Sequence, residues 1–135
     1  MKSKDELLEL ILNDSEAFNE YICDNADNGI DMSEVDLSNS EIRDITFRNI
    51  DFTSSTFSDS HLFNVQFIEC DLTSSDFTRT TITECDFSNS VLNGTDFSYS
   101  TVDYGNFSDS DLAGAIFQGA DLSNSDFSTS ENLSA

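Results

Sequence analysis

Large apolar residues recur at every fifth position of the chain from Leu37 to Phe127, without a gap. The nineteen members of this series are Leu37, Ile42, Phe47, Phe52, Phe57, Leu62, Phe67, Leu72, Phe77, Ile82, Phe87, Leu92, Phe97, Val102, Phe107, Leu112, Phe117, Leu122 and Phe127. Because 37% of the chain is hydrophobic, chance would fill only about 7 of these positions. An unbroken short period of this kind predicts a repeat architecture.

A period of five fits neither an α-helix nor a flat strand. Five residues advance roughly 500° around a helix, and an odd period alternates between the two faces of a strand. The chain therefore has to turn a corner every five residues, so that each large side chain reaches the same interior. From Phe57 to Phe127, Phe alternates strictly with an aliphatic residue, so like residues stack on like only if each coil has an even number of sides. Two sides cannot enclose a core, and we predict four.

Most residues two places before each central apolar residue are small, as the inside corners of such a coil require. They are Ser40, Ser55, Ser60, Cys70, Ser75, Thr80, Cys85, Ser90, Thr95, Ser100, Gly105, Ser110, Ala115, Ala120 and Ser125. Val35, Ile45, Ile50 and Val65 make this layer bulkier near its N-terminal end. Since the chain has an odd number of cysteines and two of them occupy this inner layer on different sides, we expect buried free thiols rather than a disulfide or a metal site.

The five-residue units between residues 35 and 130 resemble those of the pentapeptide-repeat family, which follow the pattern A-(D/N)-L-x-x. Examples are Val35-Asp36-Leu37-Ser38-Asn39, Cys70-Asp71-Leu72-Thr73-Ser74, Cys85-Asp86-Phe87-Ser88-Asn89 and Ala120-Asp121-Leu122-Ser123-Asn124. This chain departs from the commonest pattern by preferring Phe to Leu at the centre and Ser to Ala two places before it. The resemblance implies an all-β solenoid, a right-handed quadrilateral β-helix with about twenty residues per coil.

The first 29 residues lack the repeat and carry helical patterns instead. Ser3 and Glu6 are spaced as a capping box, and Leu7 and Ile11 begin an apolar face. A solenoid needs its open terminal coil covered, so we expect these helices to form a cap. The predicted divisions are an N-terminal helical cap over residues 1–29, a β-helix of just under five coils over residues 30–130, and a C-terminal tail over residues 131–135.

The composition is strongly acidic, with 27 Asp and Glu against 5 Lys and Arg and a net charge of −22. Such a surface makes nucleic acid and anionic membranes poor partners and basic proteins good ones. The chain has no long apolar run and no signal-peptide pattern at its N-terminus, so we expect a cytoplasmic protein without a membrane segment.

Candidate catalytic and metal-binding residues are few. The single histidine, His61, precedes a central Leu and is expected on the outer surface. No Gly-rich phosphate loop, nucleophile-base pair or zinc-ligand spacing is present, so we predict no cofactor and no enzymatic activity. One alternative is weak Ca²⁺ binding by carboxylates stacked one coil apart, Asp51 with Asp71 and Asp76 with Asp96.

Outward apolar side chains are the other candidates for function, because the repeat does not require them. Tyr99 and Tyr104 fall at equivalent places on adjacent sides of one coil, and Phe63 and Ile68 do the same two coils earlier. We expect Arg79 one coil below Tyr99, within reach of a cation–π contact. Scattered surface apolar residues are also common without function. The partner-binding candidates are Asp76, Asp96, Asp103, Asp109, Asp111, Tyr99, Tyr104, Phe63 and Ile68.

The charge of the predicted rod is close to that of duplex DNA. Between residues 36 and 129, sixteen carboxylates and three basic residues leave a net charge of −13, spread over all four sides. About 23 Å of duplex, the length expected for nineteen units, carries roughly 14 phosphates. The resemblance implies a matching role, since quinolone-resistance members of the family mimic DNA and bind DNA gyrase, although this rod is shorter and lacks the protruding loops of some of them.

We therefore expect a basic, nucleic-acid-binding protein as partner, with no direct binding of nucleic acid. The primary hypothesis is inhibition or modulation of a topoisomerase, nuclease, restriction enzyme or CRISPR effector by DNA mimicry. The alternative is an interaction scaffold without such a target, in which acidity serves solubility. The repeat register fails after Phe127, with Asn132 at the expected centre. The open edge of the last coil could therefore be covered by the short tail or by a second copy of the chain. Since family members dimerise through that end, a homodimer through the C-terminal coil is a further expectation.

Overall fold

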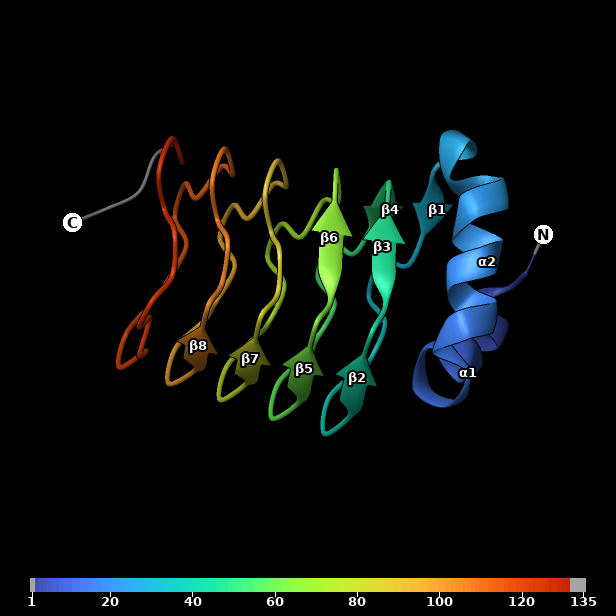
Figure 1. The fold of residues 1–135 in the computed structure, drawn as a ribbon, viewed down its shortest axis with the longest axis horizontal. Helices are drawn as coiled ribbons and strands as arrows, with labels where there is room; N and C mark the ends of the chain where they lie inside the picture. Colours follow the sequence, from blue (N-terminus) through green and yellow to red (C-terminus); the bar gives the residue numbers. More distant parts are fainter. Residues whose placement is uncertain (1, 132–135) are drawn as a thin grey trace.

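The computed structural model describes residues 2–131 and consists of two short helices followed by a stack of coils (Figure 1). Helix α1 spans Lys4–Asn13, α2 spans Ser15–Asn25, and a 3-10 turn, η1, spans Ala26–Asn28. The strands are β1 (Ile30–Asp31), β2 (Glu41–Arg43), β3 (Thr46–Arg48), β4 (Ile50–Asp51), β5 (His61–Phe63), β6 (Gln66–Ile68), β7 (Thr81–Thr83) and β8 (Thr101–Asp103). These strands are short because the chain turns every five residues.

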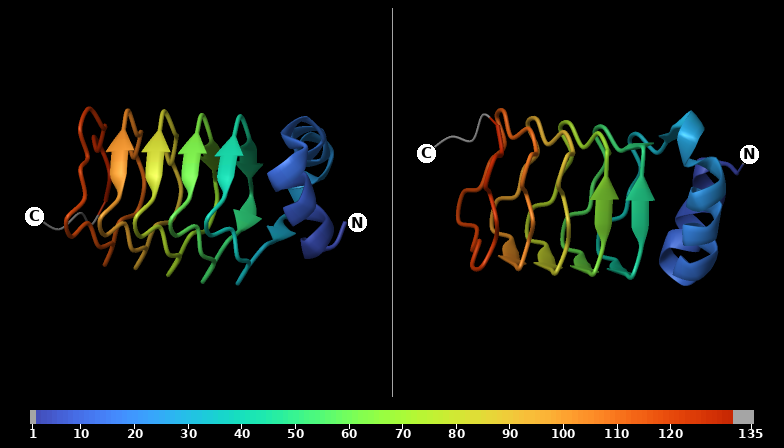
Figure 2. Two further views of the ribbon diagram at one scale, coloured as in Figure 1. Left: turned by 90° about the horizontal axis from the view of Figure 1, so that it is seen from below. Right: turned by 45° about the horizontal axis from the view of Figure 1, so that its top comes forward.

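Neighbouring coils pair in parallel with a register of twenty residues. Ile42 of β2 lies opposite Leu62 of β5, which in turn lies opposite Ile82 of β7. One side of the rod carries the four-stranded sheet β2-β5-β7-β8, and two other sides carry the pairs β3-β6 and β1-β4 (Figure 2). The predicted right-handed quadrilateral β-helix with an N-terminal helical cap is confirmed.

Each corner of the rod contains a residue in the left-handed region of backbone space. Asn39, Asp59 and Asn64 have φ values of 53°, 58° and 54°, and the same holds at nearly every fifth position. Asn, Asp and Gly tolerate this region better than other residues, which explains why they are frequent two places after the central residue. The local turn chemistry therefore produces the corner that the period of five demands.

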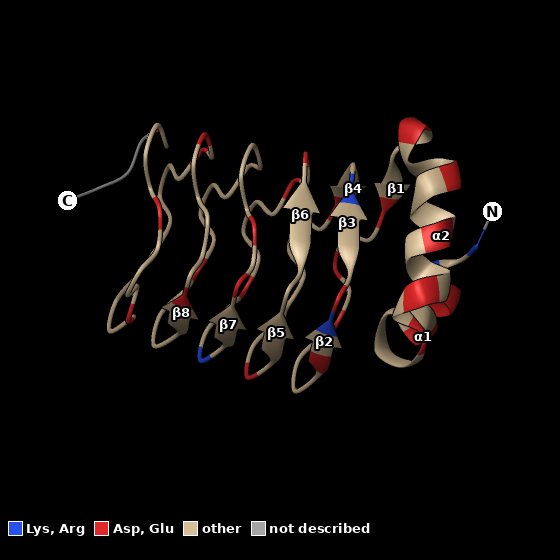
Figure 3. Cartoon of the chain, viewed as in Figure 1, with Lys and Arg blue, Asp and Glu red and all other residues tan. Residues whose placement is uncertain are grey.

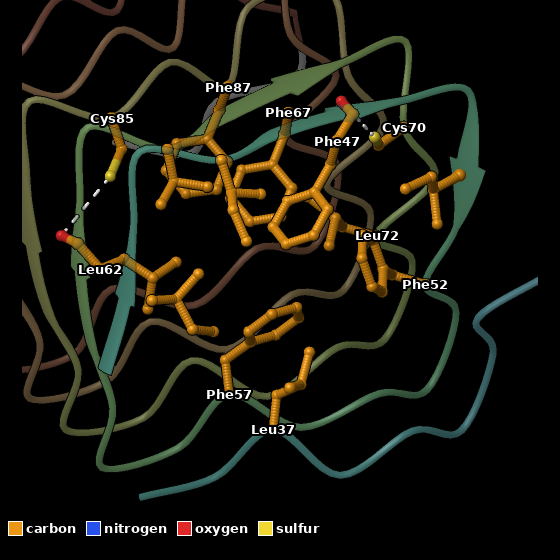
Figure 4. Packing of buried hydrophobic residues seen from close by; sticks show 14 of the residues in the cluster. Leu37, Phe47, Phe52, Phe57, Leu62, Phe67, Cys70, Leu72, Cys85 and Phe87 are labelled. Atoms are coloured by element: carbon orange, nitrogen blue, oxygen red, sulfur yellow. Dashed lines mark hydrogen bonds between the residues drawn. The ribbon is translucent and has the colours of Figure 1, made fainter. Parts of the chain in front are cut away.

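The central residues form a continuous apolar column inside the rod (Figure 4). The Phe87 ring stacks between Phe67 and Phe107, with centroid distances of 4.8 and 4.9 Å. Rings on different sides meet edge to face, as Phe77 and Phe87 do at 5.8 Å. The six phenylalanines Phe57, Phe67, Phe77, Phe87, Phe97 and Phe107 are fully buried, whereas Phe117 and Phe127 in the last coil are partly buried.

The small inner residues connect successive coils by hydrogen bonds. The Ser90 hydroxyl donates to the carbonyl of Phe67 at 2.8 Å and accepts the backbone N–H of Cys70 at 3.3 Å. The Cys70 thiol donates in the same way to the carbonyl of Phe47 at 3.3 Å (Figure 4). Both inner cysteines are free thiols, as expected, and burial raises the pKa of Cys70 and of Cys85 to about 12.

The two helices cover the N-terminal end of the coil stack (Figure 1). The expected capping box is present, since the Ser3 hydroxyl accepts the Glu6 N–H and the Glu6 carboxylate accepts the Ser3 N–H. The Phe18 ring of α2 lies edge-on to Phe47, with centroids 5.5 Å apart. Lys4 also joins cap to coil by donating from Nζ to the carbonyl of Ser33 at 2.8 Å.

No helix within residues 2–131 is both long enough and apolar enough to cross a membrane. The C-terminal tail expected over residues 131–135 lies, apart from Glu131, outside the described residues.

Candidate partner-binding surface

The Asp residues that precede central residues hold the turns of the coil. Asp76 accepts the backbone N–H of Thr78 at 2.8 Å, and Asp96 accepts that of Ser98 at 2.9 Å. Asp111 makes the corresponding bond to Ala113 at 3.2 Å. Side chains of Asp and Asn commonly bind the backbone two residues on in this way. These three carboxylates are half-buried and have one oxygen engaged in a turn, so they serve the fold as well as the surface charge.

Two further candidate carboxylates lie outside the turn-forming position. Asp103 ends strand β8, is half-buried and accepts a hydrogen bond from Nδ2 of Asn124 at 3.3 Å. Asp109 is exposed at a corner with a φ of 58°. Both lie in the C-terminal half of the rod, near the two candidate tyrosines in sequence.

Tyr99 and Tyr104 are the most exposed of the large apolar candidates, at 59% and 60%. They occupy the two corners that bound β8, with φ values of 60° and 59°. Tyr99 leans toward the next coil, because a Cβ added at Gly119 would lie 2.7 Å from its Cδ1 and 2.8 Å from its Cε1. The structure thus places this pair on one coil and at adjacent corners.

Phe63 and Ile68, the second candidate pair, are half-buried rather than fully exposed. Arg43 lies opposite Phe63 in the β2-β5 register, and its guanidinium carbon is 5.6 Å from the ring centroid. Arg48 lies opposite Ile68 in the same way. The cation of the neighbouring coil therefore already covers the Phe63 ring.

The prediction of a cation–π contact between Arg79 and Tyr99 is wrong. Arg79 turns to the preceding coil, where its Nε and Nη2 donate to the two carboxylate oxygens of Asp59 at 2.9 and 3.1 Å. This bidentate ion pair holds the pKa of Asp59 below its ordinary value. A planar guanidinium fits a carboxylate in two places, and that geometry outweighs an exposed ring.

Two exposed aliphatic residues of the coils were not among the candidates from sequence. Val91 and Ile116 are 36% and 45% exposed, and each stands where most repeat units carry Asp, Asn or Thr. Their departure from the polar character of that position is the signal that could have identified them.

Negative charge is spread along the coils and the cap, whereas basic residues are sparse (Figure 3). Arg79 is the single Lys or Arg after Arg48 in the sequence, and it is paired with Asp59. His61 is half-buried on the outer face of β5. The Asp pairs considered for Ca²⁺ do lie in register, Asp51 with Asp71 and Asp76 with Asp96. Across residues 2–131, however, no group of three or more His, Cys, Asp or Glu is arranged to hold a metal ion.

Two family matches cover most of the chain. Residues 60–134 match the family described as Pentapeptide repeat region, and residues 30–67 match Pentapeptide repeats (8 copies). No curated protein sequence matches the chain.

Several solved structures share the fold at low sequence identity. A pentapeptide repeat protein, Rfr23, from the cyanobacterium Cyanothece 51142 gives a TM-score of 0.58 at 12% identity, covering 82% of this chain and 98% of its own. One from the Arabidopsis thaliana thylakoid lumen gives 0.52 at 20% identity, covering 72% and 64%. A trypsin-treated variant of QnrB1, a plasmid-mediated fluoroquinolone resistance protein, gives 0.52 at 22% identity, covering 76% and 62%. The chain thus spans slightly less than two thirds of the latter two structures.

Proposed function

Because the chain belongs to the pentapeptide-repeat family, we propose that it is a non-catalytic binding protein whose acidic rod occupies the DNA-binding groove of a basic, nucleic-acid-handling enzyme. A topoisomerase such as gyrase, a nuclease, a restriction enzyme or a CRISPR effector presents such a groove. Occupying the groove would inhibit or modulate that enzyme. Such partners work in the cytoplasm, which is where the proposal places this protein.

The observation that carries the proposal is the negative charge of the rod, which is least interrupted from residue 49 onward. From residue 49 onward the sequence has one basic residue, and Asp59 neutralises it through a bidentate ion pair. A field of one sign attracts a basic groove by the same electrostatics that recruits DNA. The similarity of fold to a fluoroquinolone resistance protein is in keeping with the proposal.

An interaction scaffold with no DNA-handling target is the second candidate. The exposed Tyr99, Tyr104, Val91 and Ile116 favour it, because apolar and aromatic side chains supply binding energy that salt does not screen. Weak dependence of binding on salt, with loss of binding on substitution of these residues, would distinguish it from DNA mimicry.

We also propose that two copies associate through the C-terminal coil. Phe117, Leu122 and Phe127 are partly buried there, in contrast to the fully buried rings of the inner coils. Among the described residues no further coil packs on this one, and the proposal is that a second copy covers these side chains. Sedimentation equilibrium tests this: a dimer that dissociates on Phe127→Asp supports the contact, and a monomer at high concentration contradicts it.

The proposed function is tested by capturing proteins from a bacterial lysate on the immobilised chain and eluting them with duplex DNA. A matched bait, D76N/D96N/D111N, lowers the acidic charge and retains amides that can form the same turns, as Asn106 does with Ser108. The proposal expects DNA-handling enzymes that duplex DNA displaces, with weaker retention on the variant. Recovery of proteins that DNA does not displace would overturn it in favour of the scaffold.

A further inference from the structure

Tyr99 and Tyr104 stand at corners whose backbone disfavours them. Both residues lie in the left-handed region. In other coils the Tyr99 corner carries Asn39, Asp59, Arg79 and Gly119, and the Tyr104 corner carries Asp44, Asn64, Glu84 and Asn124. Bulky residues are uncommon in this region on steric grounds. The fold imposes the same backbone on Arg79 and Glu84, so the two tyrosines differ from other corners in their rings and not in their backbone. What singles out these two adjacent corners of one coil is a pair of aromatic rings that are 59% and 60% exposed.

The Tyr99 ring is held in place by the following coil. Gly119 has no Cβ, and this leaves space for the ring to lie against its backbone. Nε2 of Gln118 lies 3.5 Å from the Tyr99 hydroxyl and donates to it. The side chain is still 59% exposed, so the ring is positioned and open to a ligand at the same time.

Within residues 2–131, no Lys or Arg side chain lies over the ring of Tyr99 or Tyr104. Arg79, one coil earlier at the Tyr99 corner, is engaged by Asp59. Residues 80–131 contain nine Asp and Glu and no Lys or Arg. Two of these carboxylates adjoin Tyr104: Asp103 precedes it, and Glu84 occupies the same corner one coil earlier. The surroundings of the rings are therefore acidic without a basic residue to balance them.

A cation–π contact elsewhere in the rod indicates which group binds over such a ring. In the β2-β5 pair, the Arg43 guanidinium lies over the outward Phe63 ring at 5.6 Å. A guanidinium is planar, weakly hydrated and stacks on aromatic faces better than an ammonium group does. An arginine from another molecule would give Tyr99 and Tyr104 the cover that Arg43 gives Phe63.

We propose that Tyr99 and Tyr104, with Asp103 and Glu84, form an arginine-binding site that anchors an arginine-rich segment of the partner. The inference rests on the proposed function, since it names the chemistry by which the basic partner is held. It adds a selectivity that charge alone does not give, because charge attracts lysine and arginine equally.

The test compares fluorescently labelled hexa-arginine and hexa-lysine peptides by fluorescence anisotropy with the full chain. The two peptides carry equal charge, so the acidic surface attracts them equally. The ratio of their dissociation constants therefore measures the contribution of the tyrosine rings to binding arginine. Wild type should bind hexa-arginine about threefold to tenfold more tightly. Y99N/Y104N, which introduces the residue found at the same corners as Asn39, Asn64 and Asn124, should lose this preference and keep its affinity for hexa-lysine. Y99F/Y104F should retain it.

NMR of the tyrosine rings locates the binding. The chain has three tyrosines, and Tyr21 in α2 serves as the internal control. Hexa-arginine should shift the ring signals of Tyr99 and Tyr104 and leave those of Tyr21 in place. Equal affinity of wild type for the two peptides, or a preference that survives in Y99N/Y104N, would overturn the site. Capture of DNA-handling enzymes from lysate could still succeed in that case. The peptide experiment therefore tests the arginine site, and the lysate experiment tests the proposed function independently of it.

Discussion

Asn19 of the cap binds Thr46 of the first complete coil as a neighbouring coil would, with its Oδ1 accepting the Thr46 backbone N–H at 2.9 Å. One coil later, Gln66 is in register with Thr46, and its N–H is accepted by the backbone carbonyl of Ile45 at 2.9 Å. Nδ2 of Asn19 also donates to the carbonyl of Asp44 at 2.9 Å. One side-chain amide therefore satisfies both a donor and an acceptor at the open edge of the solenoid.

Substituting Asn19→Ala should destabilise the protein by about 1–2 kcal/mol, because it leaves the edge groups of Asp44 and Thr46 without this partner. Asn13→Ala is the matched control, since Asn13 is exposed and its amide binds only Glu9 of the same helix among the described residues. Urea unfolding followed by circular dichroism measures both. Equal midpoints for the two variants would show that the amide contributes nothing to capping.

The inner hydroxyls allow a second comparison between equivalent serines. Ser90 bridges Phe67 and Cys70 of the preceding coil, so Ser90→Ala should cost about 1–3 kcal/mol by leaving a buried carbonyl and N–H unsatisfied. The Ser75 hydroxyl is also buried but has no hydrogen-bond partner among residues 2–131. Ser75→Ala should be neutral or stabilising. The account of the ladder fails if the two substitutions shift the urea midpoint alike.

The turn carboxylates predict a dependence of stability on pH. Hydrogen bonds from Ser38, Ser123 and Ser128 lower the pKa values of Asp36, Asp121 and Asp126 respectively, so their ionised forms stabilise the folded state. This stabilisation is present above the unfolded pKa of about 3.9 and is lost as pH falls through the lowered folded pKa.

The matched variant for this effect is D36N/D121N/D126N, in which amides can form the same turns without titrating. The stability of wild type relative to this variant should be constant from about pH 7 to 5 and should fall below about pH 4. Urea midpoints measured across this range test it. A relative stability that rises on acidification would mean that repulsion among carboxylates outweighs the turn hydrogen bonds.

The fold could be predicted from the sequence because one period determines both the corners and the core. The alternation of Phe with aliphatic residues required an even number of sides, and the stacked Phe67 and Phe87 show that like does pack on like. The surface was less predictable. Nothing in the spacing shows that Arg79 chooses Asp59 over Tyr99, because both lie one coil away at the same corner, and side-chain geometry decides between them.

The role of Asn19 was also beyond sequence reasoning, since an Asn in a helical pattern gives no sign of a bond to Thr46. The half-burial of Phe63 has a similar origin, because Arg43 covers it from another coil. Contacts of this kind depend on which side-chain conformations bring separate coils together. The proposed partner-binding residues accordingly remain predictions.

The most direct test of DNA mimicry is competition between this protein and duplex DNA for one purified enzyme, with gyrase as the first choice. Labelled protein would be titrated with the enzyme at several salt concentrations, and unlabelled duplex would then be added. The account predicts an affinity that falls steeply with salt and complete displacement of the protein by duplex, because both ligands fill one basic groove. Binding that is insensitive to salt, or a ternary complex of enzyme, DNA and this protein, would contradict it.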